Sequence, residues 1–79
     1  MTTYISLLRG INVSGQKKIR MADLRSLYES LELTNVKSYV QSGNVVFDST
    51  EQDASKLARL IEAQIEQVFK YLVPVFIRD

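Results

Sequence analysis

The sequence contains neither cysteine nor histidine in its 79 residues. Without cysteine the chain cannot form a disulfide bond, so its composition does not indicate an oxidising compartment. A structural zinc site uses thiolate or imidazole ligands and is therefore not expected. The same absences exclude a cysteine nucleophile, a histidine general base and a Ser-His-Asp triad within this chain. The composition thus predicts no metal and no cofactor, and it leaves no catalytic constellation visible.

Long apolar runs are also missing. The N-terminus, Met1 to Tyr4, has no basic segment followed by an apolar one, which a signal peptide requires, and no stretch has the length of a membrane span. We therefore expect a cytoplasmic protein without membrane contact. At 79 residues the chain is the size of one domain with a small core.

The charges almost cancel, with a formal net charge of +1, but they are unevenly distributed. Residues 1–25 contain five basic side chains against one acidic side chain, a net charge of +4. The remaining residues carry five basic against eight acidic side chains, a net charge of −3. This distribution indicates a local basic patch rather than a globally basic nucleic-acid binder.

The most informative stretch is residues 36–48, which has the pattern of two strands joined by a tight Gly43-Asn44 turn. Glycine readily takes the positive φ that a type II′ turn requires. A two-residue loop would pair Tyr39 with Asp48. Alternation then places an apolar set on one face of the hairpin: Val36, Val40, Val45 and Phe47. Because an isolated hairpin is marginal in water, the rest of the chain must cover this face.

Four further elements are predicted from periodicity and end signals. Apolar residues recur at helical spacing from Met21 to about Glu32, with Arg20 as N-cap. Residues 49–52 match a capping box with Ser49 as the cap, and the helix they open runs to about Lys70. Strands are predicted over residues 3–9 and 72–78. The last strand should lie at a sheet edge, because Pro74 cannot donate a ladder hydrogen bond.

The resulting order, βαββαβ, predicts an α+β ferredoxin-like plait over residues 1–79. It would contain a four-stranded antiparallel sheet of order 4-1-3-2 with two helices on one face. The other face has no element to cover it and is a candidate interaction surface. We expect it to carry Tyr4, Ser6, Leu8, Tyr39, Gln41 and Val46. A mixed, solvated face is the alternative interpretation.

The loop over residues 10–18 is long for a strand-to-helix connection, and long loops in compact domains are often functional. Its spacing of glycines and lysines nearly matches the phosphate loop G-x-x-x-x-G-K-[ST], but Gln16 displaces the lysine and the final hydroxyl is missing. Nucleotide hydrolysis is therefore disfavoured, and binding of an anion or phosphate remains as a hypothesis beside a merely solvated loop. The candidate ligand-binding residues are Arg9, Asn12, Lys17, Lys18, Arg20 and the turn residue Asn44.

Binding of single-stranded nucleic acid is a further alternative for the uncovered face. Domains of the RNA-recognition class stack bases on aromatic side chains of the first and third strands. Here Tyr4 lies on the first strand, Tyr39 lies on the second, and the RNP1 pattern is absent.

Three segments carry a family resemblance: Leu7 to Val13, Met21 to Leu24, and Ser38 to Phe47. They resemble the N-terminal half of a bacterial family known as domain of unknown function 1697. This chain has Ser14 and Glu32 where the family usually has glycine. The resemblance implies an α/β plait and no established activity, and it implies that the chain corresponds to one half of the usual protein.

Two functions from different classes fit these observations. In the first, the chain is a non-catalytic binding or assembly domain whose open sheet face contacts a missing C-terminal half, a second copy or a ligand. In the second, residues 9–20 form the phosphate- or nucleic-acid-binding part of an enzyme that is completed elsewhere. We favour the first, because the chain supplies no general base of suitable pKa.

Overall fold

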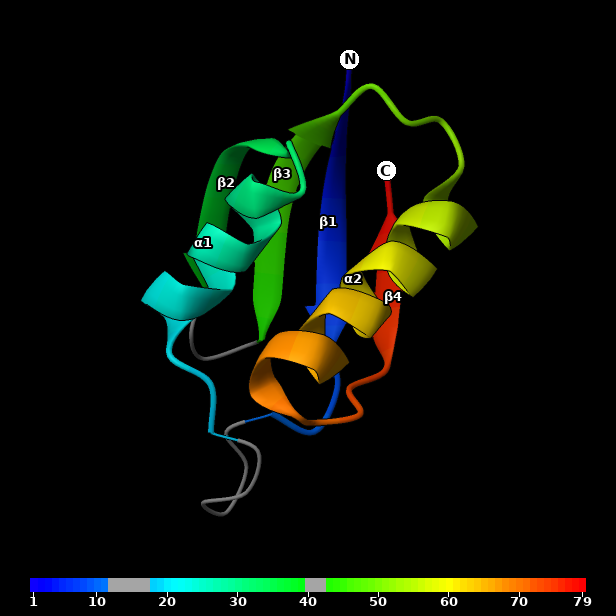
Figure 1. Ribbon diagram of the computed structural model, residues 1–79. Coiled ribbons are helices and arrows are strands. Elements are labelled where there is room, and N and C mark those ends of the chain that lie inside the picture. The colour runs from blue at the N-terminus through cyan, green and yellow to red at the C-terminus, as the bar shows by residue number, and fades with distance from the viewer. Residues whose placement is uncertain (12–17, 40–42) are drawn as a thin grey trace.

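The computed structural model describes residues 1–11, 18–39 and 43–79 (Figure 1). Its elements follow the predicted order βαββαβ. They are β1 (Thr2–Leu8), α1 (Met21–Ser30), β2 (Thr34–Tyr39), β3 (Asn44–Ser49), α2 (Ala54–Phe69) and β4 (Val75–Arg78). The last strand is shorter than predicted, because residues 72–74 lead into it without joining the sheet.

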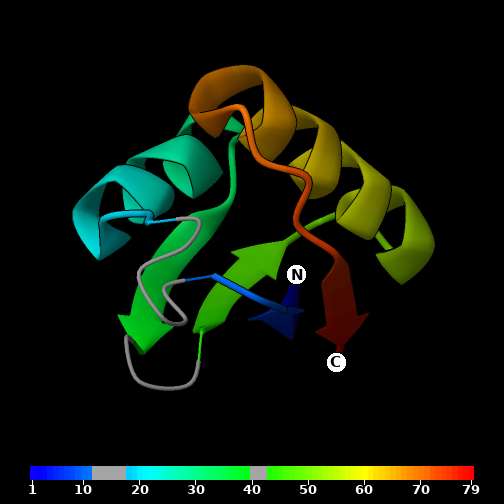
Figure 2. The ribbon, with the colours of Figure 1, turned by 90° about the horizontal axis from the view of Figure 1, so that it is seen from below.

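The four strands form one antiparallel sheet of order β2-β3-β1-β4, which is the predicted order 4-1-3-2 counted from the opposite edge. Both helices lie on the same side of this sheet, and no described element covers the other side (Figure 2). The fold is therefore α+β and ferredoxin-like, as predicted. The edge position that Pro74 indicated for β4 is also confirmed.

The prediction for the two faces of β1 is wrong. Tyr4, Ser6 and Leu8 were expected on the uncovered face, but they point into the core, with exposed fractions of 4%, 0% and 6%. Tyr4 pairs with Phe47 of β3, and their ring centroids lie 5.8 Å apart. The alternate residues Ile5 and Leu7 are only partly buried and occupy the uncovered side. Alternation could not decide between the faces, because both halves of the β1 pattern contain large apolar side chains.

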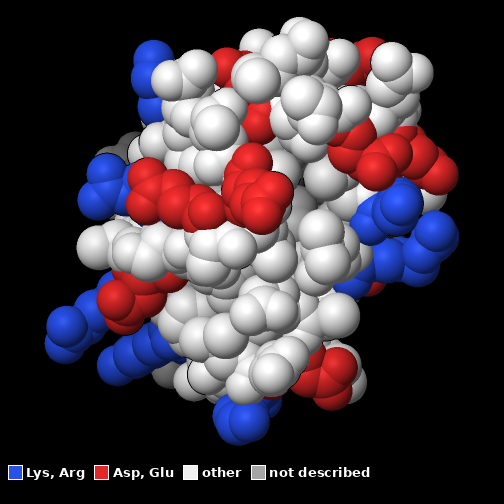
Figure 3. Space-filling view, turned by 45° about the horizontal axis from the view of Figure 1, so that its top comes forward, with Lys and Arg blue, Asp and Glu red and all other residues white. Residues whose placement is uncertain are grey.

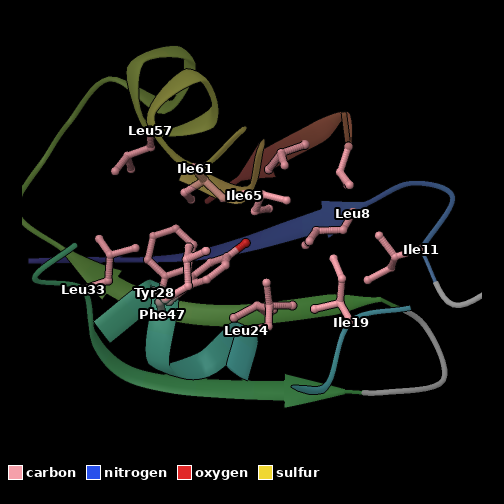
Figure 4. Close-up of a cluster of buried hydrophobic side chains, with 14 of the residues drawn as sticks. Leu8, Ile11, Ile19, Leu24, Tyr28, Leu33, Phe47, Leu57, Ile61 and Ile65 are labelled. Carbon is pink, nitrogen blue, oxygen red and sulfur yellow. The ribbon is translucent and has the colours of Figure 1, made fainter. Parts of the chain in front are cut away.

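Tyr28 lies among the buried hydrophobic side chains next to Phe47 (Figure 4) and forms a polar pair there with Ser6. Tyr28 of α1 is fully buried, and its ring meets Phe47 edge-on with centroids 5.4 Å apart. The Ser6 hydroxyl donates to the Val45 carbonyl at 3.0 Å, so the Tyr28 hydroxyl donates to Ser6 Oγ at 2.8 Å. Burial raises the pKa of Tyr28 above its ordinary value. The phenol therefore stays a neutral donor that ties α1 to the middle of the sheet.

The connection between β2 and β3 is longer than the predicted two residues. Tyr39 pairs with Asn44, not with Asp48, so residues 40–43 separate the strands. The register differs from the predicted one by an even number of positions, and the hairpin faces are therefore unchanged. Ser38 and Val45 still share the core side. Val40 and Gln41 lie outside the described residues.

A bulge interrupts β2 near its start. Thr34 pairs with Asp48 and Lys37 with Val46, which leaves one extra residue in β2. Asn35 has a positive φ of 51°, and its side-chain amide donates to Asp48 Oδ2 at 2.7 Å. The Thr3 hydroxyl donates to Asp48 Oδ1 at 2.5 Å. These two hydrogen bonds hold the pKa of Asp48 below its ordinary value.

The helix ends differ partly from the predictions. α1 begins after Arg20, which makes no side-chain capping bond, and Glu32 follows its end with a φ of 64°. A non-glycine residue in that conformation costs about 1 kcal/mol. The cap of α2 is Asp53, not Ser49, because its carboxylate accepts from the backbone N–H groups of residues 55 and 56. Leu57, Ile61 and Ile65 of α2 are buried, whereas Val68 is 52% exposed.

Gly43 is placed where a side chain would collide with the backbone. Its φ is +64°, its carbonyl accepts from Leu8 N at 3.0 Å, and a Cβ here would lie 2.9 Å from the Leu8 carbonyl oxygen.

Gly10 has a similar φ of +76°, but a Cβ there would meet no other described residue within 4 Å, so it offers a matched control. Gly10→Ala should cost roughly 1 kcal/mol of unfolding free energy from backbone strain alone. Gly43→Ala should cost clearly more, as measured by urea unfolding, and equal losses would contradict this account.

The hydrogen bonds to Asp48 predict a specific response to acid. A carboxylate with a lower pKa in the folded state adds stability that is complete above its unfolded pKa of about 3.9 and is lost as pH falls through the folded pKa. Asp48→Asn should therefore flatten the acid limb of a stability-versus-pH curve. Thr3→Val should move that limb to higher pH, because it removes one of the two bonds. Denaturant unfolding between pH 2 and 7 measures both, and unchanged curves would show that Asp48 contributes nothing.

Candidate functional site: the open sheet face

The side of the sheet opposite the helices, here called the open sheet face, is built from two rows that cross all four strands. The strand pairings give the first row as Tyr39, Asn44, Leu7 and Phe76, and the second as Lys37, Val46, Ile5 and Arg78. Asp48 and Thr3 follow beyond the second row. Each row spans three strand spacings, or about 14 Å.

The first row has an exposed aromatic side chain at each end. Tyr39 on β2 is 53% exposed and Phe76 on β4 is 51% exposed. Leu7 lies between them and is partly buried, as are Ile5 and Val46 in the second row. The open sheet face therefore presents a continuous apolar centre between two aromatic edges. This makes the open sheet face a candidate interaction surface.

Basic side chains surround this apolar centre. Lys37 and Arg78 end the second row on the two edge strands. The Arg9 guanidinium carbon lies 5.4 Å from the centroid of the Phe76 ring, within cation–π distance. The Arg9 N–H donates to the Pro74 carbonyl at 3.1 Å, which joins the end of β1 to the start of β4. Against these three cations the face carries Asp48, so its charge is positive.

Asn44 is the polar group in the middle of the first row. Its side-chain oxygen is buried and has no hydrogen-bond partner among the described residues. A buried acceptor without a donor costs free energy, and each such atom in a native fold calls for an explanation. Asn44 lies between Tyr39 and Leu7 in the first row, and because its oxygen is buried, a ligand on this face would reach it only if the side chain turned outward.

The structure brings together only part of the predicted interaction face. Tyr39 and Val46 lie on the open sheet face, Tyr4 and Leu8 are in the core instead, and Gln41 lies outside the described residues. Phe76 was missed, because Val75, Phe76 and Ile77 are all apolar and the sequence does not show which of them face outward. The pairing of Phe76 with Leu7 decides this.

The predicted anion-binding set is divided. Arg9 stacks on Phe76, at the open sheet face. Lys18 and Arg20 are exposed and lie directly before α1, next to the buried Ile19. Asn12 and Lys17 lie outside the described residues. Among the described residues, no further contact supports the phosphate-loop hypothesis. Anion binding by these residues therefore stays a prediction.

The helix side of the molecule offers a less specific surface. Acidic and basic side chains are interspersed on the view in Figure 3. A groove between α2 and residues 72–74 contains Arg59, Glu62 and Glu66. Glu62 has a structural role there, because its carboxylate accepts from Val75 N at 2.8 Å and covers the outer edge of β4.

Metal clusters and membrane-spanning helices are both absent from the described residues. Across residues 1–11, 18–39 and 43–79, no three His, Cys, Asp or Glu side chains lie close enough to hold a metal ion. Neither of the two helices in this part of the chain has the length and apolarity needed to cross a membrane.

Comparison with known proteins reveals similarity along the whole chain. The chain covers 42% of a solved structure described as the conserved bacterial protein SP0830 from Streptococcus pneumoniae, with 96% of its own residues aligned, 33% sequence identity and a TM-score of 0.82. It thus spans less than half the length of that protein. A comparison with curated proteins found no match. The family model for "Protein of unknown function (DUF1697)" matches residues 1–79, and the chain therefore belongs to this family.

Proposed function

We propose that this chain is a non-catalytic binding domain, and that its open sheet face receives a negatively charged partner. One observation carries the proposal: the first row places exposed Tyr39 and Phe76 at opposite edges of a partly buried apolar centre. The basic side chains around that centre favour a partner of opposite charge.

The lowered pKa of Asp48, the acidic group on this face, favours binding over catalysis. The Asp48 carboxylate accepts hydrogen bonds from Asn35 and Thr3, which lower its pKa. A general base works best with a pKa near the working pH, and this shift moves Asp48 away from that range. The group that could take up a proton on this face is thus held as an ionised structural acceptor.

A second copy of the chain fits this surface poorly. Four strands about 4.8 Å apart and about five residues of 3.3 Å each give a face of roughly 300 Å². Stable protein pairs bury about 800 Å² on each partner. A two-fold axis parallel to the strands would also lay β2 over β4 and bring Lys37 opposite Arg78. The small area and the facing cations therefore both disfavour face-to-face self-assembly. A ligand, or a further domain on a longer chain, requires neither 800 Å² of this face nor a surface that is complementary to itself.

The proposal is tested by amide NMR of the labelled chain with three separate probes: inorganic phosphate, poly-glutamate and a single-stranded DNA of twelve nucleotides. We expect at least one probe to shift amides of the two rows, centred on Leu7, Asn44 and Phe76, and to leave α2 unchanged. Shifts that map to the groove beside Arg59 and Glu62, or no shifts with any probe, would overturn the proposal.

Self-association is measured alongside by analytical ultracentrifugation. We expect a monomer at 100 µM. A dimer that Leu7→Glu dissociates, while the matched control Leu72→Glu does not, would replace ligand binding with self-assembly. Leu72 is suited to this control because it is 70% exposed and lies in the groove on the helix side.

A further inference from the structure

The geometry of the open sheet face points to a specific ligand class, and this inference rests on the proposed binding function. We infer that the face binds single-stranded nucleic acid, with bases stacked on Tyr39 and Phe76 and phosphates held by Arg9, Lys37 and Arg78. Four observations support it: the spacing of the aromatics, the cation on Phe76, the distribution of charge and the unpaired oxygen of Asn44.

The aromatic side chains are placed as stacking platforms. Tyr39 and Phe76 are half exposed and end a row that runs across the sheet from β2 to β4. Their separation of about 14 Å leaves room for a further base over Leu7 between them. Stacking on aromatic side chains suits any base, because every base has a π-face. A strand lying along this row would cross the sheet roughly at right angles to its strands.

Arg9 adds a flat cation to one of these platforms. Its guanidinium carbon lies 5.4 Å from the Phe76 ring centroid, and its backbone N–H is fixed by the Pro74 carbonyl. Guanidinium planes stack on bases as aromatic rings do, and they also pair with phosphate oxygens. The β4 edge therefore offers stacking and charge at the same place.

The charges of the second row run parallel to the aromatic row. Lys37 lies next to Tyr39 on β2, and Arg78 lies next to Phe76 on β4, each two residues along its strand. A backbone lying beside stacked bases would meet one cation at each edge. This arrangement matches the combination of a positive track and aromatic platforms that single-strand binders use. A purely apolar protein surface would instead leave both cations without partners, since interface cores are depleted in charge.

Asn44 gives a reason to prefer unpaired bases. Its buried side-chain oxygen lacks a donor among the described residues and lies in the row between the two aromatics. Unpaired bases expose amino and imino groups on their Watson–Crick edges, whereas a duplex uses these groups in pairing. If the Asn44 side chain turns outward on binding, a base stacked beside Tyr39 would offer such a donor to it, and a duplex could not.

Fluorescence anisotropy with a labelled single-stranded DNA of twelve mixed nucleotides, at 50 mM salt, tests the inference. Stacking contributes about 1–3 kcal/mol per base, so Tyr39→Ala and Phe76→Ala should each weaken binding by roughly fivefold or more. Tyr39→Phe should keep the affinity. Lys37→Gln should lower the slope of log affinity against log salt by about 0.7. A duplex of the same sequence should bind more weakly than the single strand.

Two control variants lie away from the open sheet face. Leu72→Ala changes an exposed apolar side chain and Lys56→Gln an exposed cation on α2, and both should bind as the unchanged chain does. Circular dichroism and urea unfolding establish that each variant is folded. Asn44→Ala removes the acceptor and should reduce the preference for single strand over duplex.

The outcomes distinguish a failure of this inference from a failure of the proposed binding function. Equal affinities of the unchanged chain, Tyr39→Ala and Phe76→Ala would overturn the inference, as would equal binding of duplex and single strand. If the DNA does not bind but poly-glutamate or phosphate shifts the two rows, the ligand class is wrong and the binding function stands. If no probe shifts the rows, both fail.

Discussion

The pairing of β1 with β3 is the constraint on which both sides of this sheet depend. Ser6 lies opposite Val45 and Tyr4 opposite Phe47, so these residues turn towards the helices. The same register sends Ile5 and Leu7 to the open side, beside Val46 and Asn44. Because side chains alternate with a period of two, a slip of one residue would exchange the two sets. The core and the open sheet face are therefore specified by one set of backbone hydrogen bonds.

The buried Tyr28 gives this register an energetic preference. Its hydroxyl donates to Ser6, which in turn donates to the Val45 carbonyl, so both buried hydroxyl groups are satisfied. In a slipped register Ile5 or Leu7 would face Tyr28 and leave the phenol without an acceptor, at a cost of about 1–3 kcal/mol. Apolar packing alone would not discriminate, because both faces of β1 are apolar. The polar pair thus specifies which of two comparably hydrophobic faces is buried.

The sequence was sufficient to predict the order of elements, the sheet order and the edge position of β4, because these depend on local signals. Helical spacing defined α1 and α2, and Pro74 restricted β4 to an edge. The faces of β1 could not be predicted, since they depend on the Tyr28–Ser6 contact across 22 positions. The prediction of a two-residue hairpin loop was wrong for a related reason. Gly43 has the predicted positive φ, but it needs to be glycine because of the Leu8 carbonyl, a tertiary contact that turn preferences do not include. Phe76 entered the site only through its pairing with Leu7.

The basic residues of the open sheet face have a second role that does not depend on any ligand. Lys37 and Arg78 lie on the two edge strands, where charged side chains guard against pairing with another sheet. Their presence alone would therefore be expected in a solvated sheet as well. Edge protection does not, however, require exposed aromatics at both ends of one row, an arginine stacked on one of them, or a buried acceptor between them. The proposed binding function therefore rests on these three features, and so on Tyr39, Asn44 and Phe76, rather than on the charges beside them.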